Sequence, residues 1–349
     1  MKVVVTGASG FVGKRLVPLL VSRGHSVVAA SRSALSFPGA DWYRAPELGA
    51  GADWSNALQG AEGVVHLAGR ARIGPETKLE ENLCQRINAE GTARLARQAA
   101  DSGVRSFLFL SSVHAVAEES DEAITVSTVP RPVSAYGRSK LAAEEALRAE
   151  LGSGACAWTI MRPPAVYGPA NSGNMERLHK LVKTRIPLPF ASVCNRRSFI
   201  YVENLSDLIV KCLDNPKAFG KIFLPSDGED LSTPELIRAI ARANAGVEHE
   251  ARSWEHGGKS GDSVGDRETC HTVGRRGAPS ALRSGSRHSA RLFHFPPSLL
   301  EAAGRLPGLG SLRKLSGSLY VDSASLSRDL GWTAPFTMDE GLRRLVASS

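Results

Sequence analysis

Residues 3–13 read Val3-Val4-Val5-Thr6-Gly7-Ala8-Ser9-Gly10-Phe11-Val12-Gly13. The valines predict a short buried strand, and Leu16, Leu19 and Leu20 beyond the glycines have the spacing of an apolar helix face. Glycines at such a junction let the backbone turn sharply and approach a pyrophosphate, whose charge then lies against free N–H groups at the positive end of the helix. The stretch therefore predicts a strand, a tight turn and a helix, with a dinucleotide bound at the turn.

The glycine spacing matches the general dinucleotide fingerprint only in part. Two residues separate Gly7 from Gly10, whereas the standard pattern has one residue between its first two glycines. An isolated match of this kind also fits a glycine-rich turn in an unrelated fold, so the rest of the chain has to decide.

The next apolar runs along the chain are short and continuous, and they cover residues 25–30, 63–68 and 106–110. Continuous apolarity is typical of strands covered on both faces, and helical periodicity marks residues 76–100 and 135–151. We therefore expect an α/β fold: a Rossmann doubly wound parallel sheet with a smaller C-terminal α/β lid that binds substrate.

The expected domain division follows from these patterns. Residues 1–168 are predicted to form the dinucleotide-binding domain, with return strands and helices near residues 198–224, and residues 169–349 to form mainly the substrate-binding part. Residues from about 246 to 290 are rich in Ser, Gly, Arg and His with few aliphatic positions, which predicts a disordered insertion. This insertion fits either a tolerated loop or a stretch translated out of frame.

Weaker patterns mark three further elements. Residues 157–161 and 221–224 are predicted strands, assigned mostly to the smaller lid, and residues 234–243 are a predicted helix with Ser232-Thr233 as its cap.

Composition limits the class of protein. The chain has 349 residues, 42% of them hydrophobic, enough to bury one large core or two unequal ones. No stretch approaches the roughly 20 apolar residues that cross a bilayer, and the amino end reads as a strand rather than a signal peptide, so we expect a cytoplasmic protein. Its five scattered cysteines lack the close pairs of metal sites or redox dithiols, which predicts reduced thiols and no metal site.

The formal net charge of +8 favours an anionic partner. Basic residues are spread along the chain without interleaved aromatic residues or a recognisable binding module, which argues against nucleic acid. An anionic small-molecule substrate accounts for the charge.

Tyr136-Gly137-Arg138-Ser139-Lys140 is the second informative motif. On a helix, Tyr136 and Lys140 share a face, so the ammonium can lie near the phenol and favour its ionised form. Such a tyrosine can act as a general acid or base near neutral pH. Alone, the pattern also fits an ordinary surface pair on an amphipathic helix.

Ser111-Ser112 follows the predicted strand at residues 106–110. The carboxyl end of a strand is where an open α/β sheet presents ligand-binding groups, so a hydroxyl here can bind a reacting oxygen.

Together these features resemble the extended short-chain dehydrogenase/reductase family of sugar-nucleotide epimerases, dehydratases and ketoreductases, across nearly the whole chain apart from the insertion. Within the family the chain is most similar to bacterial 4-epimerases and 4-ketoreductases of nucleotide-linked sugars for the O-antigen of lipopolysaccharide. The motifs that carry the resemblance are the glycine loop, His66-Leu67-Ala68-Gly69, Asn88-Ala89-Glu90-Gly91-Thr92, Ser111-Ser112, the tyrosine motif, Arg162-Pro163-Pro164-Ala165-Val166-Tyr167-Gly168-Pro169, Arg197-Ser198-Phe199-Ile200-Tyr201-Val202 and Leu330-Gly331-Trp332.

The resemblance assigns roles to individual residues. It implies that Tyr136 is the catalytic acid/base, that Lys140 lowers the pKa of Tyr136 and holds the nicotinamide ribose, and that Ser112, rather than Ser111, binds the C4 oxygen of the sugar. Arg197 would pair with the substrate diphosphate. The residues expected to bind the cofactor are Gly7, Ser9, Gly10, Phe11, Val12, Gly13, Ser31, Arg32, Leu67, Ala68, Gly69, Tyr136, Lys140, Pro163 and Val166.

Two departures from the family pattern bear on the reaction. Ser31-Arg32 stands where NAD-preferring members have an acidic residue, which favours NADP(H) while leaving NAD(H) possible. Val113-His114 stands where 4,6-dehydratases have an Asp-Glu pair, which argues against dehydration.

The activity expected from these departures is NAD(P)H-dependent reduction of a UDP-4-keto-6-deoxy-N-acetylhexosamine. A UDP-sugar 4-epimerase with tightly bound NAD is the alternative, and a non-catalytic NADP-binding regulatory protein is a distant one. By resemblance to the family, the enzyme is expected to be a homodimer.

Overall fold

The structure is a computed structural model that describes residues 1–71, 77–152, 154–170, 173–257, 290–296 and 315–348, with the backbone alone for residues 249–257. Its centre is a sheet of seven parallel strands in the order β3-β2-β1-β4-β5-β6-β9. A second sheet has the order β10-β8-β7. The strands are β1 (Lys2–Thr6), β2 (Ser26–Ser31), β3 (Ala40–Arg44), β4 (Gly63–His66), β5 (Ser106–Leu110), β6 (Ala157–Met161), β7 (Ala165–Tyr167), β8 (Arg197–Tyr201), β9 (Lys221–Phe223) and β10 (Asp230–Leu231).

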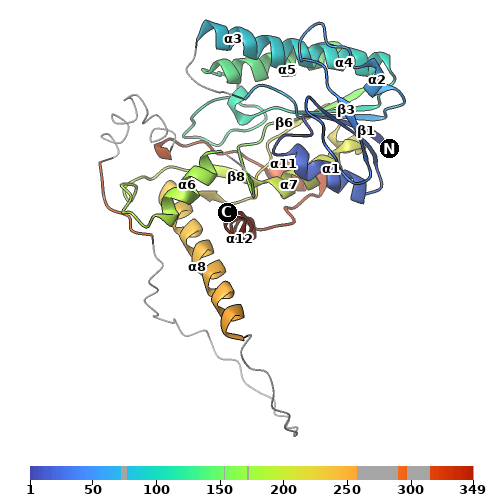
Figure 1. Cartoon of the computed structure of the whole chain (residues 1–349). Helices are drawn as coiled ribbons and strands as arrows, with labels where there is room; N and C mark the ends of the chain where they lie inside the picture. Colours follow the sequence, from blue (N-terminus) through green and yellow to red (C-terminus); the bar gives the residue numbers. More distant parts are fainter. Residues whose placement is uncertain (72–76, 153, 171–172, 258–289, 297–314, 349) are drawn as a thin grey trace, which may run out of the picture.

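Helices cover both faces of the large sheet (Figure 1). One face packs against α1, α7 and α11, and the other against α2, α4 and α5. The helical segments are α1 (Gly13–Ser22), α2 (Ser55–Leu58), α3 (Lys78–Cys84), the π-helix η1 (Gln85–Glu90), α4 (Gly91–Asp101), the 3₁₀ turn η2 (Val113–Ala115), α5 (Ala135–Leu151), α6 (Asn174–Lys183), α7 (Val202–Leu213), the 3₁₀ turn η3 (Pro216–Ala218), α8 (Thr233–Gly257), α11 (Ala324–Leu330) and α12 (Met338–Ala347).

The continuous apolarity of the strands matches their burial on both faces. Val3 and Val5 pack on the side of α1, whereas Val4 packs on the side of α4, and all three are fully buried. Strand order reverses between β1 and β4, so the carboxyl ends of these two strands meet at the switch point where open α/β sheets bind ligands. The Rossmann doubly wound sheet predicted from the sequence is confirmed.

The second sheet packs with α6, α8 and α12 into a separate apolar cluster (Figure 1). Residues 318–322 join this part to the loop that follows η2. Arg197 of β8 forms a bridge with Leu319, and Ile124, in the loop that follows η2, forms one with Val321. The C-terminal part is therefore fastened to the segment that follows Ser112.

Three expectations need correction or completion. Residues 157–161 and 221–223, assigned mostly to the smaller lid, form β6 and β9 at the edge of the large sheet, because their backbones pair with β5 and with each other. Strand β3 was not predicted, because it has no continuous apolar run: it lies at the edge of the sheet and none of its residues is fully buried.

The helix predicted for residues 234–243 is longer than expected. It continues as α8 through residues 246–257, which were assigned to the disordered insertion. Val247 packs against the C-terminal cluster and Glu248 pairs with Arg185, and these contacts stabilise helical backbone beyond the apolar pattern. The remainder of the predicted insertion lies outside the described residues, apart from Ala290.

Candidate active site

The glycine loop lies between β1 and α1, with α1 beginning at Gly13. Side chains have no room at its ends: a Cβ on Gly7 would lie 2.8 Å from Ala68 N, and one on Gly13 would lie 2.5 Å from Gly7 O. Within the described residues the backbone N–H groups of Phe11 and Val12 donate no hydrogen bond. The loop therefore presents free donors at the positive end of a ten-residue helix, which fits the pyrophosphate of a dinucleotide.

Leu67, Ala68 and Gly69 leave the carboxyl end of β4 beside this loop. Thr6 at the end of β1 accepts hydrogen bonds from the first two: its carbonyl from Leu67 N (3.2 Å) and its Oγ1 from Ala68 N (3.2 Å). A Cβ on Gly69 would lie 3.5 Å from Lys140 Nζ. The two strand ends and the tyrosine helix thus meet at one place.

His66, the last residue of β4, contacts side chains of β1 and α4. Its ring nitrogens contact Thr6 Oγ1 (2.7 Å) and Thr92 Oγ1 (3.0 Å), and its ring stacks on Phe109. Burial, with Lys140 nearby, lowers the pKa of His66 to about 3. The imidazole is therefore neutral and joins β1, β4 and α4 without adding charge.

Lys140 lies under the site on α5, and its side chain is almost completely buried. Its Nζ donates to Leu110 O (2.9 Å) and lies 4.6 Å from the centre of the Phe109 ring. Burial lowers the pKa of Lys140 to about 8, against the partial compensation of Glu144. An ammonium with this pKa titrates within reach of physiological pH.

Tyr136 stands one helical turn before Lys140, half-buried, with its ring edge-on to His114 at 6.3 Å. Burial raises its pKa, a hydrogen bond with Ser112 acts in the opposite direction, and Cys84 raises the pKa further. Lys140 is not among the groups that shift the pKa of Tyr136, because its ammonium is directed at Leu110 O, and its expected effect on the phenol stays a prediction.

The two serines after β5 have different partners. Ser111 Oγ donates to Glu144 Oε1 (2.5 Å), so its proton is committed to a buried carboxylate. Ser112 caps η2 by accepting from His114 N (3.2 Å), and its hydroxyl is the group that acts to lower the pKa of Tyr136. This arrangement supports the choice of Ser112 over Ser111 for contact with a reacting oxygen.

Ser31 and Arg32 stand at the carboxyl end of β2. Ser31 Oγ accepts from Trp42 Nε1 (3.0 Å) and donates to Ser33 O (2.5 Å), so this hydroxyl already has a donor and an acceptor. Arg32 is exposed and forms no hydrogen bond or ion pair with the described part of the chain.

Pro163 and Val166 follow β6. Pro163 is buried and its carbonyl accepts from Val113 N (3.0 Å), which places it directly behind the Ser112 turn. Val166 in β7 is half-buried between the two apolar clusters that meet there. A Cβ on nearby Gly168 would lie 3.5 Å from Phe11 Cζ, so this segment also reaches the glycine loop.

Arg197 lies at the start of β8, away from the tyrosine helix. Its Nη1 donates to Gly317 O (2.8 Å), and burial lowers the pKa of the guanidinium while Glu119 raises it. The structure thus places Arg197 at the junction with the C-terminal segment, and its contact with a substrate diphosphate stays a prediction.

Two supporting groups were not predicted from the sequence. Glu144, fully buried on α5, binds Arg162 through Oε1 (3.0 Å to Nε) and Oε2 (2.6 Å to Nη2). Asn88 donates to Ser139 Oγ (2.9 Å) and accepts from Arg70 N (2.7 Å). Glu144 follows Lys140 by four residues, so the spacing of the tyrosine motif gave a signal that it shares this face of the helix.

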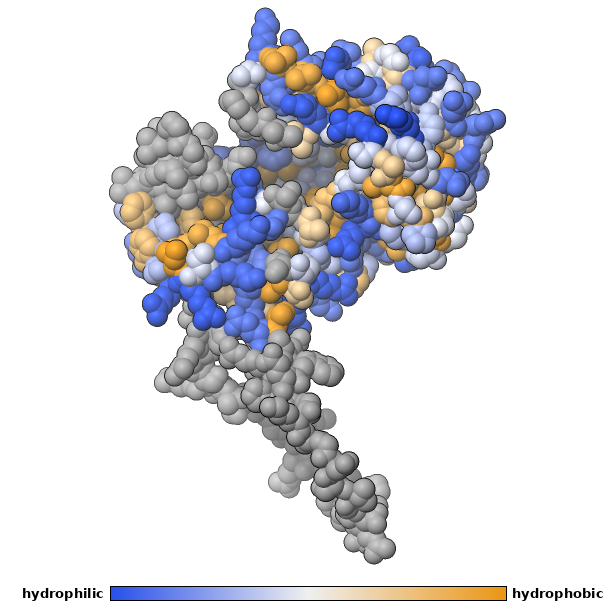
Figure 2. Space-filling view, viewed as in Figure 1, coloured by the Kyte–Doolittle hydropathy of each residue, from blue (hydrophilic) through white to orange (hydrophobic). Residues whose placement is uncertain are grey.

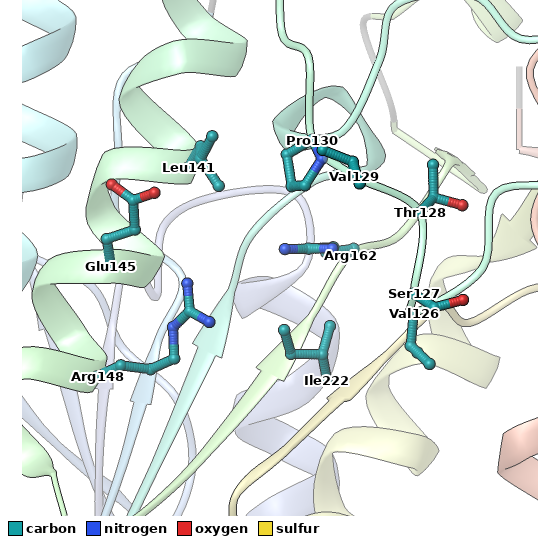
Figure 3. Close-up of a pocket in the computed structure, with 10 residues that line it drawn as sticks. All are labelled: Val126, Ser127, Thr128, Val129, Pro130, Leu141, Glu145, Arg148, Arg162 and Ile222. Carbon is teal, nitrogen blue, oxygen red and sulfur yellow. The ribbon is translucent and has the colours of Figure 1, made fainter.

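A cavity of about 400 Å³ opens on a neighbouring face of α5, between that helix and the loop 126–130 (Figure 3). Leu141, Glu145 and Arg148 line it from α5, and Arg162 and Ile222 lie opposite them. Neither Tyr136, Lys140 nor Ser112 lines this cavity, so it is separate from the candidate active site.

The arrangement as a whole brings together a dinucleotide loop, a buried ammonium, and a phenol whose pKa a serine hydroxyl lowers. A phenol and a serine hydroxyl side by side can hold one oxygen of a substrate and exchange its proton.

None of the helices in the described part of the chain has the length and apolarity that a membrane span requires.

Comparison with known proteins identifies the family of the chain. A family model described as "NAD dependent epimerase/dehydratase family" matches residues 3–224. The chain is 31% identical over 348 residues to a UDP-glucose 4-epimerase of Vibrio cholerae, a match that covers 98% of this chain and 93% of the relative.

A second relative is the N-acetyl-alpha-D-glucosaminyl-diphospho-ditrans,octacis-undecaprenol 4-epimerase of Escherichia coli O157:H7, 27% identical over 248 residues, or 69% of this chain and 72% of the relative. Among solved structures, the UDP-glucose 4-epimerase of Thermus thermophilus in complex with NAD has a TM-score of 0.70 at 21% identity, covering 100% of this chain and 98% of that chain. At that identity the solved structure supports the fold alone.

Proposed function

Because the chain is an enzyme that belongs to the NAD-dependent epimerase/dehydratase family, we propose that it inverts the C4 hydroxyl of a UDP sugar by transient oxidation. The observation that carries this proposal is the match to the Vibrio cholerae UDP-glucose 4-epimerase along 98% of the chain, with Tyr136, Lys140 and Ser112 in one site. The sequence alone favoured the 4-ketoreductase, and the 4-epimerase activities of the two relatives described above reverse that order.

The chain's own residues supply proton transfer and orientation in the proposed reaction. Tyr136 takes the proton of the C4 hydroxyl when C4 is oxidised and returns a proton when C4 is reduced on its other face. Ser112 holds the same oxygen through the oxidised stage, and Lys140 provides positive charge beneath the site. A bound nicotinamide group supplies the hydride acceptor and donor at C4.

The 4-ketoreductase remains the second candidate because of the charges around β2. Ser31 pairs in register with Arg44 of β3, so the exposed guanidiniums of Arg32 and Arg44 follow two adjacent strand ends. Two cations at the position of the adenosine ribose favour the additional phosphate of NADP(H), although NAD(H) also fits the site. Exchangeable NADPH suits a reductase, which consumes one hydride per turnover.

The C-terminal part is proposed to bind the sugar nucleotide. The support is the cation at Arg197, whose burial makes an anionic partner such as a diphosphate favourable. In this proposal residues 1–168 carry the cofactor and residues 169–349 carry mainly the substrate. The undecaprenol-linked relative supports a role in building O-antigen sugars.

A homodimer through α3 and α5 is part of the same proposal. Leu79 of α3 is 69% exposed and Val133, just before α5, is 71% exposed. Figure 2 shows apolar side chains, in orange, on the part of the surface where α3 lies in Figure 1. A second copy would cover this surface.

One experiment separates the candidates. The purified protein is incubated with UDP-glucose or UDP-N-acetylglucosamine, and separately with a UDP-4-keto-6-deoxy-N-acetylhexosamine plus NADPH, with products identified by NMR. Interconversion of C4 epimers without net cofactor consumption, lost in Tyr136→Phe, supports the epimerase. Stoichiometric NADPH consumption supports the reductase, and absence of both reactions contradicts both candidates.

A further inference from the structure

The N-terminus of helix α5 is hydrogen-bonded to a carboxylate from an earlier segment of the chain. Glu118, four residues beyond His114 of η2, accepts from Val133 N through Oε2 (2.9 Å) and from Ser134 N through Oε1 (2.9 Å). The hydroxyl of Ser134 also donates to Glu118 Oε1. One side chain thus receives three hydrogen bonds at the first residues of the helix that carries Tyr136.

Ser134 connects the carboxylate of Glu118 to the first turn of α5 through a second hydrogen bond. It is the N-cap residue, and its Oγ accepts from Gly137 N (3.0 Å). Tyr136 lies between these two hydrogen-bonded residues. The position of its Cα along the helix is therefore set by the Glu118–Ser134 pair.

The first turn of α5 also packs closely against η2, the turn that Ser112 caps. A Cβ on Gly137 would collide with the carbonyl oxygen of His114 and would lie 2.9 Å from Glu118 Oε1. His114 in turn packs edge-on against the ring of Tyr136. Residues 112–118 and the first turn of α5 therefore form one close-packed unit.

Glu118 is charged in this position. Burial raises the pKa of its carboxyl, but the hydrogen bonds from Ser134 and Val133 outweigh burial and lower the pKa overall. A negative charge at the N-terminus of a seventeen-residue helix is also favoured by the helix dipole.

We propose that Glu118 is a positioning residue that holds the phenol of Tyr136 in register with the hydroxyl of Ser112. The proposal rests on the function assigned above to Tyr136. Glu118 acts through the start of α5 and makes no contact with the reacting atoms. Its loss lets the first turn of α5 shift against the turn that follows Ser112, so the effect of the Ser112 hydroxyl that lowers the pKa of the phenol weakens.

The test compares Glu118→Gln with Glu122→Gln, which makes the same chemical change in the same loop at an exposed side chain without a hydrogen bond in the described residues. For each holoenzyme, kcat and KM for the UDP sugar are measured. The pKa of Tyr136 is obtained from phenolate absorbance, with the matching Tyr136→Phe protein as the blank. The other ionisable groups around the phenol are Cys84 of α3, His114 of η2 and Lys140 of α5 itself, and all are unchanged between variants.

We expect Glu118→Gln to lower kcat about tenfold while KM changes less than about twofold, because the substrate contacts remain and the proton-transfer geometry does not. The pKa of Tyr136 should rise by about half a unit or more as the Ser112 hydroxyl moves away from the phenol. Glu122→Gln should match the wild type in all three quantities.

Unchanged kcat and unchanged Tyr136 pKa in folded Glu118→Gln would overturn the proposal. A fall in the Tyr136 pKa would overturn it too, because Glu118 would then act on the phenol through its charge. If Glu118→Gln does not fold, Ser134→Ala decides, since it removes one of the three hydrogen bonds: a smaller loss of kcat in the same direction supports the proposal, and none contradicts it. The absorbance titration needs no turnover, so it decides on Glu118 even if the proposed reaction is wrong.

Discussion

Two neighbouring faces of helix α5 show how one short stretch of sequence acquires two kinds of chemistry. One face carries Lys140 and Glu144, buried beneath the candidate active site, and the next carries Leu141 and Glu145, which line the open cavity of Figure 3. The residues alternate along the chain, yet only the first face has shielded charges with fixed partners. Burial therefore distinguishes the residues of α5 that lie beneath the candidate active site from those that line the open cavity.

Glu144 and Glu145 show the difference between the two faces most clearly. Glu144 is fully buried and bonds to both Arg162 and Ser111, whereas Glu145 makes no hydrogen bond or ion pair within the described residues. A buried ion pair adds little net stability, but removing one partner leaves the other charge uncompensated. Glu144 should therefore be sensitive to substitution and Glu145 tolerant.

The largest expected effect is on the first face. Tyr136→Phe removes the proton donor and acceptor while keeping the ring against His114, so kcat should fall about a thousandfold. Dinucleotide affinity, measured by fluorescence titration, should change little, because the glycine loop is untouched. Substantial residual turnover would mean that another group moves the proton.

Breaking the buried pair comes next. Glu144→Gln leaves the guanidinium of Arg162 buried without its counter-charge, and the free energy of unfolding should fall by about 3 kcal/mol. Chemical denaturation followed by circular dichroism measures the change. A loss below about 1 kcal/mol would show that water reaches Arg162 through the adjoining cavity.

The pH dependence of stability tests Lys140. Its pKa is about 8 in the folded chain and 10.5 in the unfolded chain, so between these values the unfolded state binds more protons and stability rises with pH. Relative to Lys140→Met, cofactor-free wild type should gain about 2.5 kcal/mol of unfolding free energy across this window. A flat difference would show that the ammonium is well solvated.

The smallest effect is expected on the second face. Glu145→Gln should change the unfolding free energy by less than about 0.5 kcal/mol and leave turnover intact, because the carboxylate lines an open cavity. The same measurements as for Glu144→Gln apply. A large loss of turnover would connect the cavity to the active site and remove the contrast between the two faces.

The sequence predicted the elements whose pattern is local. The glycine loop, the strands before and after it, and the helix of Tyr136 and Lys140 have spacings that follow from strand and helix geometry. It failed where contacts outside the segment decide. Strand β3 forms by backbone pairing with β2 at the edge of the sheet, β6 and β9 join the large sheet through backbone pairing, and α8 is prolonged by the contacts of Val247 and Glu248.

The same division holds within the site. The placement of Tyr136, Lys140 and Ser112 at the carboxyl ends of the strands could be predicted, and their catalytic roles stay predictions. Glu118 gave no signal, because it lies sixteen residues before its partner Ser134 in a segment without periodicity. Asn88 was quoted only as part of a motif, and its bond to Ser139 is a tertiary contact.

By itself, the sequence determined a dinucleotide-binding α/β fold with a tyrosine and a lysine one helical turn apart, because both follow from short-range spacing. Only the tertiary structure decided that the pKa of Tyr136 is raised, that Lys140 is directed at Leu110 O, and that Ser111 is committed to Glu144 while Ser112 faces the phenol. The physical reason is that desolvation and hydrogen-bond partners are set by residues brought together from distant segments, and these determine the charge that each group carries.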